Sequence, residues 1–255
     1  MHIWGAAEVA GNVARGGGNG GGVYNEGLLH FHDDVFFEVN SAEGGADGGE
    51  GNGGLGGAIL NVGGEVRFYG EAELYHNEAK AGSALVNAEG GKVVMHERTK
   101  ILDNVSQEDE GSEAGAVWNQ QDSVLWFRSS VSWKRNRGYN AGALLNDGKT
   151  MFRGDLNVQD NSALMHGGGF INGPGANMIF EGQVDFLSNI ATGSGGAILN
   201  HAALRFRHND DEMTLLFEDN YCGKSECQDI QNKDGSSVKG LDDVPDLCEI
   251  GSITL

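Results

Sequence analysis

Arginine is unevenly distributed in this sequence, and its placement suggests a binding surface. Five of the nine arginines fall in two series of positions that recur once per sequence repeat. By the alternation of side chains along a strand, both series are expected to point outward. The residues we expect to contact a ligand are Arg67, Tyr69, His96, Trp126, Arg128, Arg153, Arg205 and Arg207. Guanidinium groups bind carboxylate or sulfate, and Tyr and Trp rings stack on sugars or guanidinium.

These residue types predict a face that binds an acidic glycan or an acidic protein surface. The alternative is that the arginines only pair with acidic neighbours and protect a flat sheet from association. No catalytic role is needed for either interpretation.

Cleavage of an acidic polysaccharide is the catalytic alternative for such a face. A hydrolase needs two carboxylates placed across the glycosidic bond, and a lyase needs a base beside the uronate. The adjacent acidic pairs within the repeats, Asp33-Asp34 and Asp210-Asp211, lie at opposite ends of the repeat array. The histidines form no triad that the spacing reveals, and the Asn-Thr-Asp, Gly-His-Gly and Arg-Ile-Lys signatures of polygalacturonases are absent. We therefore expect no catalytic residues; an enzyme, if this is one, would resemble a polysaccharide lyase.

Two acidic loops form a candidate metal site. Successive repeats are joined by segments of similar length, but two of these segments are longer than the others, and both are expected to leave the fold at the same corner. Their carboxylates are Asp47, Glu50, Glu108, Asp109 and Glu110. Because calcium takes carboxylate and carbonyl oxygens, a weak calcium site is one interpretation and a pair of solvated loops is the other. No other cofactor is expected.

The three cysteines all lie near the C-terminal end, at Cys222, Cys227 and Cys248. In an extracellular protein one disulfide is expected, either Cys222–Cys227 or Cys227–Cys248, with one thiol left over. Three reduced thiols are the alternative. The spacing lacks the pattern of zinc ligands.

Internal repeats are the feature that must position all of these residues. A motif of two small residues, an apolar pair and an asparagine occurs seven times, ending at Asn25, Asn61, Asn87, Asn119, Asn146, Asn172 and Asn200. A second motif follows each copy, with a large apolar residue three positions before another asparagine, as in Phe37/Asn40 and Phe186/Asn189. Between the two motifs lies a third apolar stretch, centred on Phe31 in the first repeat and Phe206 in the seventh.

Three short strands per repeat cannot bury an apolar face alone, but stacked coils about 4.8 Å apart enclose a continuous core. We therefore predict an all-β, right-handed parallel β-helix of about seven three-strand coils. It covers residues 1–220, and an acidic, irregular tail or cap covers 221–255. Glycine, at 43 of 255 residues, suits tight corners. The recurrent asparagines are expected to adopt left-handed backbone conformations and to form hydrogen-bonded ladders.

The motifs resemble those of a known group. Gly-Gly-Ala-Ile-x-Asn at 56–61 and 195–200, and Phe-x-x-Asn at 186–189 and 217–220, resemble the paired motifs of the chlamydial polymorphic outer-membrane proteins. They are also similar to the wider set of pectin-lyase-like β-helix proteins. The resemblance implies an extracellular or cell-surface passenger with a structural, adhesive or acidic-glycan-binding role. It is specific for the fold and not for an activity.

Charge and the position of the first motif complete the expectations. The formal net charge of −20 repels phosphate backbones, so nucleic acid is not expected as a partner. Membrane insertion is not expected, and Met1 does not open a secretory signal peptide. Val9–Asn12 already match the second motif, so the chain starts midway through a coil and is interpreted as part of a longer protein.

Overall fold

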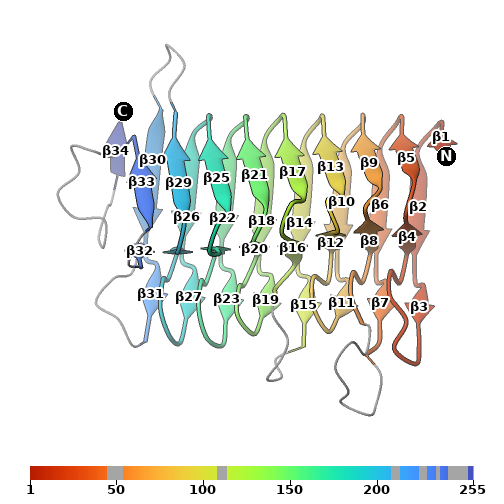
Figure 1. Ribbon diagram of the computed structural model, residues 1–255, viewed down its shortest axis with the longest axis horizontal. Helices are drawn as coiled ribbons and strands as arrows, with labels where there is room; N and C mark the ends of the chain where they lie inside the picture. The colour runs from red at the N-terminus through yellow and green to blue at the C-terminus, as the bar shows by residue number, and fades with distance from the viewer. Residues whose placement is uncertain are drawn as a thin grey trace.

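The computed structural model describes residues 1–44, 54–107, 114–207, 213–223, 229–233, 236–240 and 252–254. Within these residues the protein is all-β and contains no helix. The chain winds into a parallel β-solenoid of about seven turns, in which each strand pairs with the corresponding strand of the next coil (Figure 1). The predicted fold class is confirmed.

Four sheets run along the solenoid. Sheet A contains β1 (His2–Ile3), β5 (Leu28–Phe31), β9 (Glu65–Phe68), β13 (Lys92–Met95), β17 (Val124–Phe127), β21 (Lys149–Phe152), β25 (Asn177–Phe180), β29 (Ala203–Phe206) and β33 (Ser237–Lys239). Sheet B contains β2 (Ala7–Ala10), β6 (Val35–Glu38), β10 (Ala72–Tyr75), β14 (Thr99–Leu102), β18 (Val131–Lys134), β22 (Leu156–Gln159), β26 (Val184–Leu187), β30 (Thr214–Glu218) and β34 (Ser252–Thr254).

Sheets C and D complete each coil. Sheet D carries the first motif and contains β4 (Val23–Asn25), β8 (Ile59–Val62), β12 (Leu85–Ala88), β16 (Val117–Asn119), β20 (Leu144–Asn146), β24 (Phe170–Asn172), β28 (Ile198–Asn200) and β32 (Ile230–Asn232). Sheet C contains β3 (Val13–Ala14), β7 (Ser41–Ala42), β11 (Glu78–Ala79), β15 (Val105–Ser106), β19 (Arg137–Gly138), β23 (Ser162–Ala163), β27 (Ile190–Ala191) and β31 (Tyr221–Cys222). Its strands add a fourth, two-residue strand to the three that the sequence predicts for each coil. Two residues are too few to show a period of alternation.

Stacked phenylalanines form the core along the solenoid axis. Phe127 and Phe152 lie in adjacent coils with ring centroids 5.1 Å apart and planes 1° from parallel, and Phe180 stacks on Phe152 at 5.2 Å. This separation is close to the ordinary spacing between strands of about 4.8 Å. Identical residues at equivalent positions therefore stack face to face and bury one continuous apolar column.

The apolar pair of the first motif splits between two environments. Ile59 is fully buried in the main core, whereas Leu60, the next residue, packs with Val86 and Ala88 in a small cluster outside the sheet. The sequence alone leaves the direction of these two side chains open. Alternation along the strand sends them to opposite sides of sheet D, and both sides are covered.

Two ladders of asparagines, buried except at their ends, run through the corners. In the first, each Nδ2 donates to the Oδ1 of the next coil over distances of 2.7–2.9 Å, through Asn25, Asn61, Asn87, Asn119, Asn146, Asn172, Asn200 and Asn232. The predicted ladder is confirmed. The second joins Asn12, Asn40, Asn77, Asn104, Asn136, Asn161, Asn189 and Asn220 at 2.9–3.0 Å.

The left-handed backbone conformation does not fall on the asparagines, and that expectation is wrong. In the second ladder the residue before each asparagine has positive φ: Gly11, Val39, His76, Asp103, Arg135, Asp160, Ser188 and Asp219. Each ladder asparagine of this set uses its backbone N–H to donate to the next Oδ1, as Asn40 does to Asn77 at 3.0 Å. Because that bond constrains the backbone of the asparagine, the preceding residue adopts the left-handed conformation at the corner.

Val39 is the β-branched member of this left-handed set, with φ of 54° and 53% of its surface exposed. A left-handed conformation costs a residue with a Cβ about 1–2 kcal/mol, and asparagine tolerates it. We expect Val39→Asn to raise the free energy of unfolding by about 1 kcal/mol. Urea unfolding checks this, with Val105→Asn as the control, because Val105 is also exposed but lies in strand β15 without positive φ. An equal effect of both substitutions would contradict the strain argument.

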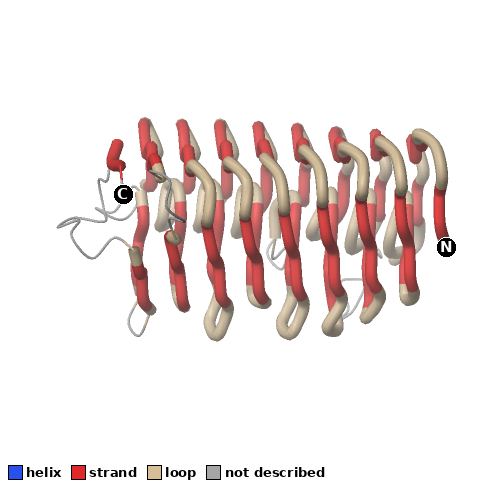
Figure 2. Tube along the Cα trace, turned by 90° about the horizontal axis from the view of Figure 1, so that it is seen from above, coloured by secondary structure: helices blue, strands red, loops and turns tan. Residues whose placement is uncertain are grey.

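Parallel pairing continues past the predicted boundary at residue 220. Strand β32 pairs with β28 and places Asn232 at the end of the first ladder, and β33 pairs with β29 in sheet A. Strand β34 pairs with β30 in the antiparallel sense, unlike the other paired strands of the described chain. Seen from above, the coils lie side by side in a row from the N-terminal to the C-terminal end (Figure 2).

Candidate functional site

The outward side of sheet A carries the predicted ligand-binding residues. Strand register aligns Arg67, Trp126 and Arg205 in one column, with His30, Val94, Met151 and Ile179 between or beside them. A second column lies one residue beyond the strands and holds Tyr69, His96, Arg128, Arg153 and Arg207. Backbone hydrogen bonds to the preceding coil extend the ladder to this column, such as Arg128 N–H to Met95 O at 2.9 Å. All eight predicted residues therefore share one face, which we call the sheet A face.

A third column on the same face adds residues that the sequence did not single out. It runs through Leu28, Glu65, Lys92, Val124 and Lys149 at the start of each strand. Lys239 of β33 extends the Arg205 column by one coil. Lys92 and Lys149 lie outside the two series in which arginine recurs, and Lys239 lies beyond the seventh repeat, so only the register reveals that they belong to the same surface.

Positive charge is concentrated on this face. It carries eight cationic side chains, Arg67, Lys92, Arg128, Lys149, Arg153, Arg205, Arg207 and Lys239, out of 17 Lys and Arg in the chain. Among the described residues it carries two carboxylates, Glu65 and Glu181, although the chain has 37 Asp and Glu. Eight positive charges less two negative ones give the face a net charge of +6, while the whole chain has −20.

Two carboxylates each bridge a pair of these cations. Glu65 forms a close ion pair with Arg67 and a second with Lys92 at 3.4 Å. Glu181 lies 3.3 Å from Arg153 and 3.7 Å from Arg207. Burial is the largest single effect on the pKa of the Glu65 carboxyl and raises it. The contacts with Arg67 and Lys92 together outweigh burial, so this pKa lies below its usual value. Three of the five arginines therefore have an acidic neighbour on the face.

The other cations have no such neighbour. Among the described residues no carboxylate lies within 4.0 Å of Arg128, Lys149, Arg205 or Lys239. Arg205 donates to the Oδ1 of Asn177 at 3.3 Å, which leaves its charge uncompensated. Pairing with acidic side chains therefore does not account for these four cations.

Arg128 and Arg153 flank an indole ring at the middle of the face. Their guanidinium carbons lie 4.6 and 4.7 Å from the centroid of the Trp126 ring. Both Arg128 and Arg153 are exposed to solvent. Cation–π contact holds a guanidinium in place without using its hydrogen-bond donors. Arg128 therefore keeps its donors for carboxylate or sulfate oxygens, whereas Arg153 in the adjacent coil already has Glu181 3.3 Å from its Nε.

The rings of the second column stack on one another. Tyr69 lies between His32, at 5.1 Å and 8°, and His96, at 4.6 Å and 25°. Both faces of the Tyr69 ring are covered, so a sugar ring has no face of this tyrosine to stack on. Burial lowers the pKa of His96, and the charges of Arg128 and Arg67 lower it further, which favours its neutral form. The face therefore offers cationic hydrogen-bond donors more than open aromatic planes.

The carboxylates of this face are poorly placed for glycosidic cleavage. Glu65 in β9 and Glu181 after β25 are separated by four strand spacings, or roughly 19 Å at the ordinary strand spacing. Glycosidases place their two carboxyl groups about 5–9.5 Å apart. A hydrolytic site built from this pair is not consistent with the geometry.

A different carboxylate pair lies on sheet B, at positions that the sequence analysis does not single out. Asp155 and Asp185 line a hollow of about 240 Å³ together with Arg98 and Asn157. Burial raises the pKa of the Asp185 carboxyl, and the charge of Asp155 raises it further. Raised carboxyl pKa values occur at catalytic acids, although structural sites show them too. The residues come from successive coils, so no local motif could have revealed the pair.

Neither a protein-family model, nor a curated protein, nor a solved structure matches this chain. The resemblance to the chlamydial polymorphic outer-membrane proteins and the pectin-lyase-like proteins therefore stays a prediction. The parallel β-solenoid itself is established by the strand pairing.

The remaining predicted sites fall largely outside the described residues. This applies to Asp47, Glu50, Glu108, Asp109 and Glu110 of the calcium site, and to Cys227 and Cys248. Cys222 is buried in β31, and its pairing stays a prediction. In the described part of the chain no helix is long and apolar enough to cross a membrane.

Proposed function

We propose that this protein is a non-catalytic, extracellular or cell-surface β-solenoid whose sheet A face binds an acidic glycan. One observation carries the proposal: in the described part of the chain, eight cationic side chains gather on a face that holds two carboxylates, although the chain has 17 basic and 37 acidic residues. A strongly acidic protein would otherwise repel a polyanion, so a local basic face is what allows such a ligand to approach. An acidic protein surface is the second partner that this chemistry suits.

The arrangement fits a linear ligand that lies along the solenoid axis. Arg128, Arg153 and Arg207 repeat in one column, and Arg205 and Lys239 repeat in the adjacent one. Each coil advances the column by about 4.8 Å. A polymer with carboxylate or sulfate groups along its length can therefore meet a cation in each coil from β17 to β33 except that of β25, where Glu181 lies between Arg153 and Arg207, whereas a small anion would meet only one or two.

Binding to an acidic-glycan array, with and without calcium, tests the proposal. We expect the Arg128→Ala/Arg153→Ala double variant to lose about 10–100-fold in affinity, because hydrogen bonds to charged groups contribute about 1.5–3 kcal/mol each when buried and less when exposed. Binding of the unsubstituted protein should also weaken as salt rises. The matched control is Arg98→Ala/Arg135→Ala, which removes the same charge from residues that pair with Glu71 and Asp103 away from the sheet A face.

Equal losses in the two double variants would contradict a specific face, and so would the absence of binding to every acidic glycan. Product analysis on each bound glycan separates binding from cleavage. Shortened or unsaturated products would favour the alternative of a polysaccharide lyase or hydrolase, and Asp155 and Asp185 would be the first residues to replace.

A further inference from the structure

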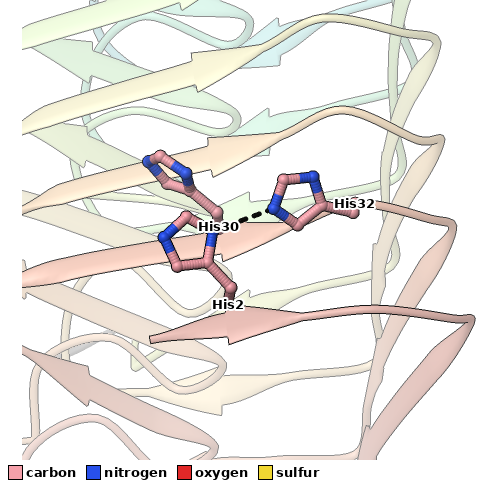
Figure 3. A group of neighbouring side chains, drawn as sticks. All are labelled: His2, His30 and His32. Atoms are coloured by element: carbon pink, nitrogen blue, oxygen red, sulfur yellow. Dashed lines mark hydrogen bonds between the residues drawn. The ribbon is translucent and has the colours of Figure 1, made fainter.

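Three histidines converge at the N-terminal end of the sheet A face. His2 of β1 is the register partner of His30 in β5, and His32 lies two residues beyond His30 on the same side of the strand. The backbone fixes this arrangement, because His30 N–H donates to Met1 O at 3.0 Å and His32 N–H donates to Ile3 O at 2.9 Å. Figure 3 shows the three imidazole rings grouped on the outer surface of these two strands.

The distances between their nitrogens suit a metal ion. One ring nitrogen from each histidine lies within 4.8 Å of those of the other two. His2 Nδ1 and His32 Nε2 are 2.9 Å apart and share a hydrogen bond. A tetrahedral zinc ion with Zn–N bonds of about 2.0–2.1 Å separates its ligand nitrogens by about 3.4 Å. Small side-chain rotations would therefore bring the three nitrogens to metal-binding distances.

We propose that His2, His30 and His32 bind a divalent transition-metal ion of the zinc, copper or nickel class. Imidazole is a preferred ligand of these ions, and sets of three histidines bind zinc with a fourth position left open. The site differs in kind from the calcium site considered for the acidic loops. Hard cations such as calcium prefer oxygen ligands, whereas these histidines offer nitrogen ligands. The site is independent of the proposed glycan binding, which depends on Arg128 and Arg153 several coils away.

The surroundings hold the rings and leave a nitrogen available. Trp4 stacks on His32 at 3.7 Å and 5°, and Tyr69 lies on His32 at 5.1 Å and 8°, so the plane of this imidazole is constrained. The Nε2 atom of His30 is shielded from solvent and has no hydrogen-bond partner among the described residues. Arg67, the next residue in the His30 column, has its charge offset by Glu65. A His32 ring held in this way loses little side-chain entropy when the ion binds.

The competing explanation is that the histidines only continue the ring stack that runs through Tyr69 and His96. His96 belongs to that stack, and among the described residues it is not part of a cluster of three potential metal ligands. It is therefore the matched control, since His96→Ala shortens the stack but leaves the proposed ligands intact.

Calorimetric titration of the tag-free full chain with Zn²⁺ tests the site, with Co²⁺ absorption as a second readout. We expect one high-affinity equivalent per chain and a visible Co²⁺ band of tetrahedral intensity. Removal of an outer-shell partner costs about 10–100-fold in metal affinity, so loss of a direct ligand in His30→Ala or His32→Ala should cost at least about 100-fold. His96→Ala should retain the unsubstituted affinity and the Co²⁺ band.

Circular dichroism on each variant separates lost binding from lost folding. If an alanine variant does not fold, His30→Gln and His32→Gln keep the size of the side chain and remove the imidazole. Absence of a high-affinity equivalent in the unsubstituted protein would overturn the proposal. So would an equal loss in His96→Ala and His30→Ala, because that result assigns the ion to the ring stack and not to the three histidines.

Discussion

Asn136→Ala is expected to lower the free energy of unfolding by about 3–5 kcal/mol, since each buried polar group left without a partner costs about 1–3 kcal/mol. Asn136 lies in the middle of the second ladder and is fully buried. Its Nδ2 donates to Asn161 Oδ1 at 2.9 Å and to Ile101 O at 2.8 Å. Its Oδ1 accepts from the backbone N–H of Asn104 at 3.1 Å and from Asn104 Nδ2 at 3.0 Å.

Alanine removes four hydrogen bonds at once and leaves the Asn104 N–H buried without this acceptor. A typical domain is stable by about 5–15 kcal/mol in total, so urea unfolding should show a large shift. Gln121→Ala removes an amide of similar chemistry from an exposed position and should change the stability by no more than about 0.5 kcal/mol. A comparable small change in Asn136→Ala would show that the ladder contributes little beyond the strand pairing.

Periodicity explains why the sheet A face could be predicted before its geometry was known. In a solenoid, residues one repeat apart in sequence become neighbours in space, so a series such as Arg128 and Arg153 becomes a column. Alternation along each strand then decides which columns face outward. The phenylalanine column and the first asparagine ladder follow from the same translation, and the pairing of Phe127 with Phe152 confirms it.

The sequence did not predict features that are built from different residue types in different coils. The left-handed residue before each asparagine of the second ladder varies from Gly11 to Val39 to Arg135, because the corner requires a backbone conformation and not a side chain. Lys149 was missed because it lies outside the arginine series, and Lys239 because it follows the last repeat that the sequence reveals. His2 precedes the first complete motif, so only its register with His30 places it in the histidine cluster.

The proposed binding function of the sheet A face depends on the register of the coils. Both ladders hold every coil at one register, and the columns of the sheet A face exist only while that register is kept. A strand shifted by one residue would turn Arg128 inward and Phe127 outward. We therefore expect ladder variants that still fold to keep their surface charge pattern, and variants that lose register to lose ligand binding together with stability.

Gly142→Ala is the second substitution for which we expect a large loss, of about 2–3 kcal/mol, in the range of overpacked sites. Gly142 precedes β20, where one coil lies close against the next. A Cβ built on it would lie 2.0 Å from the carbonyl oxygen of Gly168 and 2.8 Å from the backbone nitrogen of Ser162. Both obstacles are backbone atoms of the following coil, which cannot rotate away as a side chain does. Its φ is not positive, so the cost is steric and not conformational.

The equivalent position in another coil holds Ser83, which is fully buried, so a Cβ can be accommodated there when the adjacent coils adjust. This is why we expect Gly142→Ala to lose stability and to keep the fold. Gly27→Ala is the control, because a Cβ on Gly27 meets no atom within 4 Å and its φ is also not positive. Urea unfolding that shows equal stability for the two variants would mean that the glycines suit the turns and not the close approach of coils. A selective loss in Gly142→Ala would instead explain the high glycine content as a requirement of coil stacking.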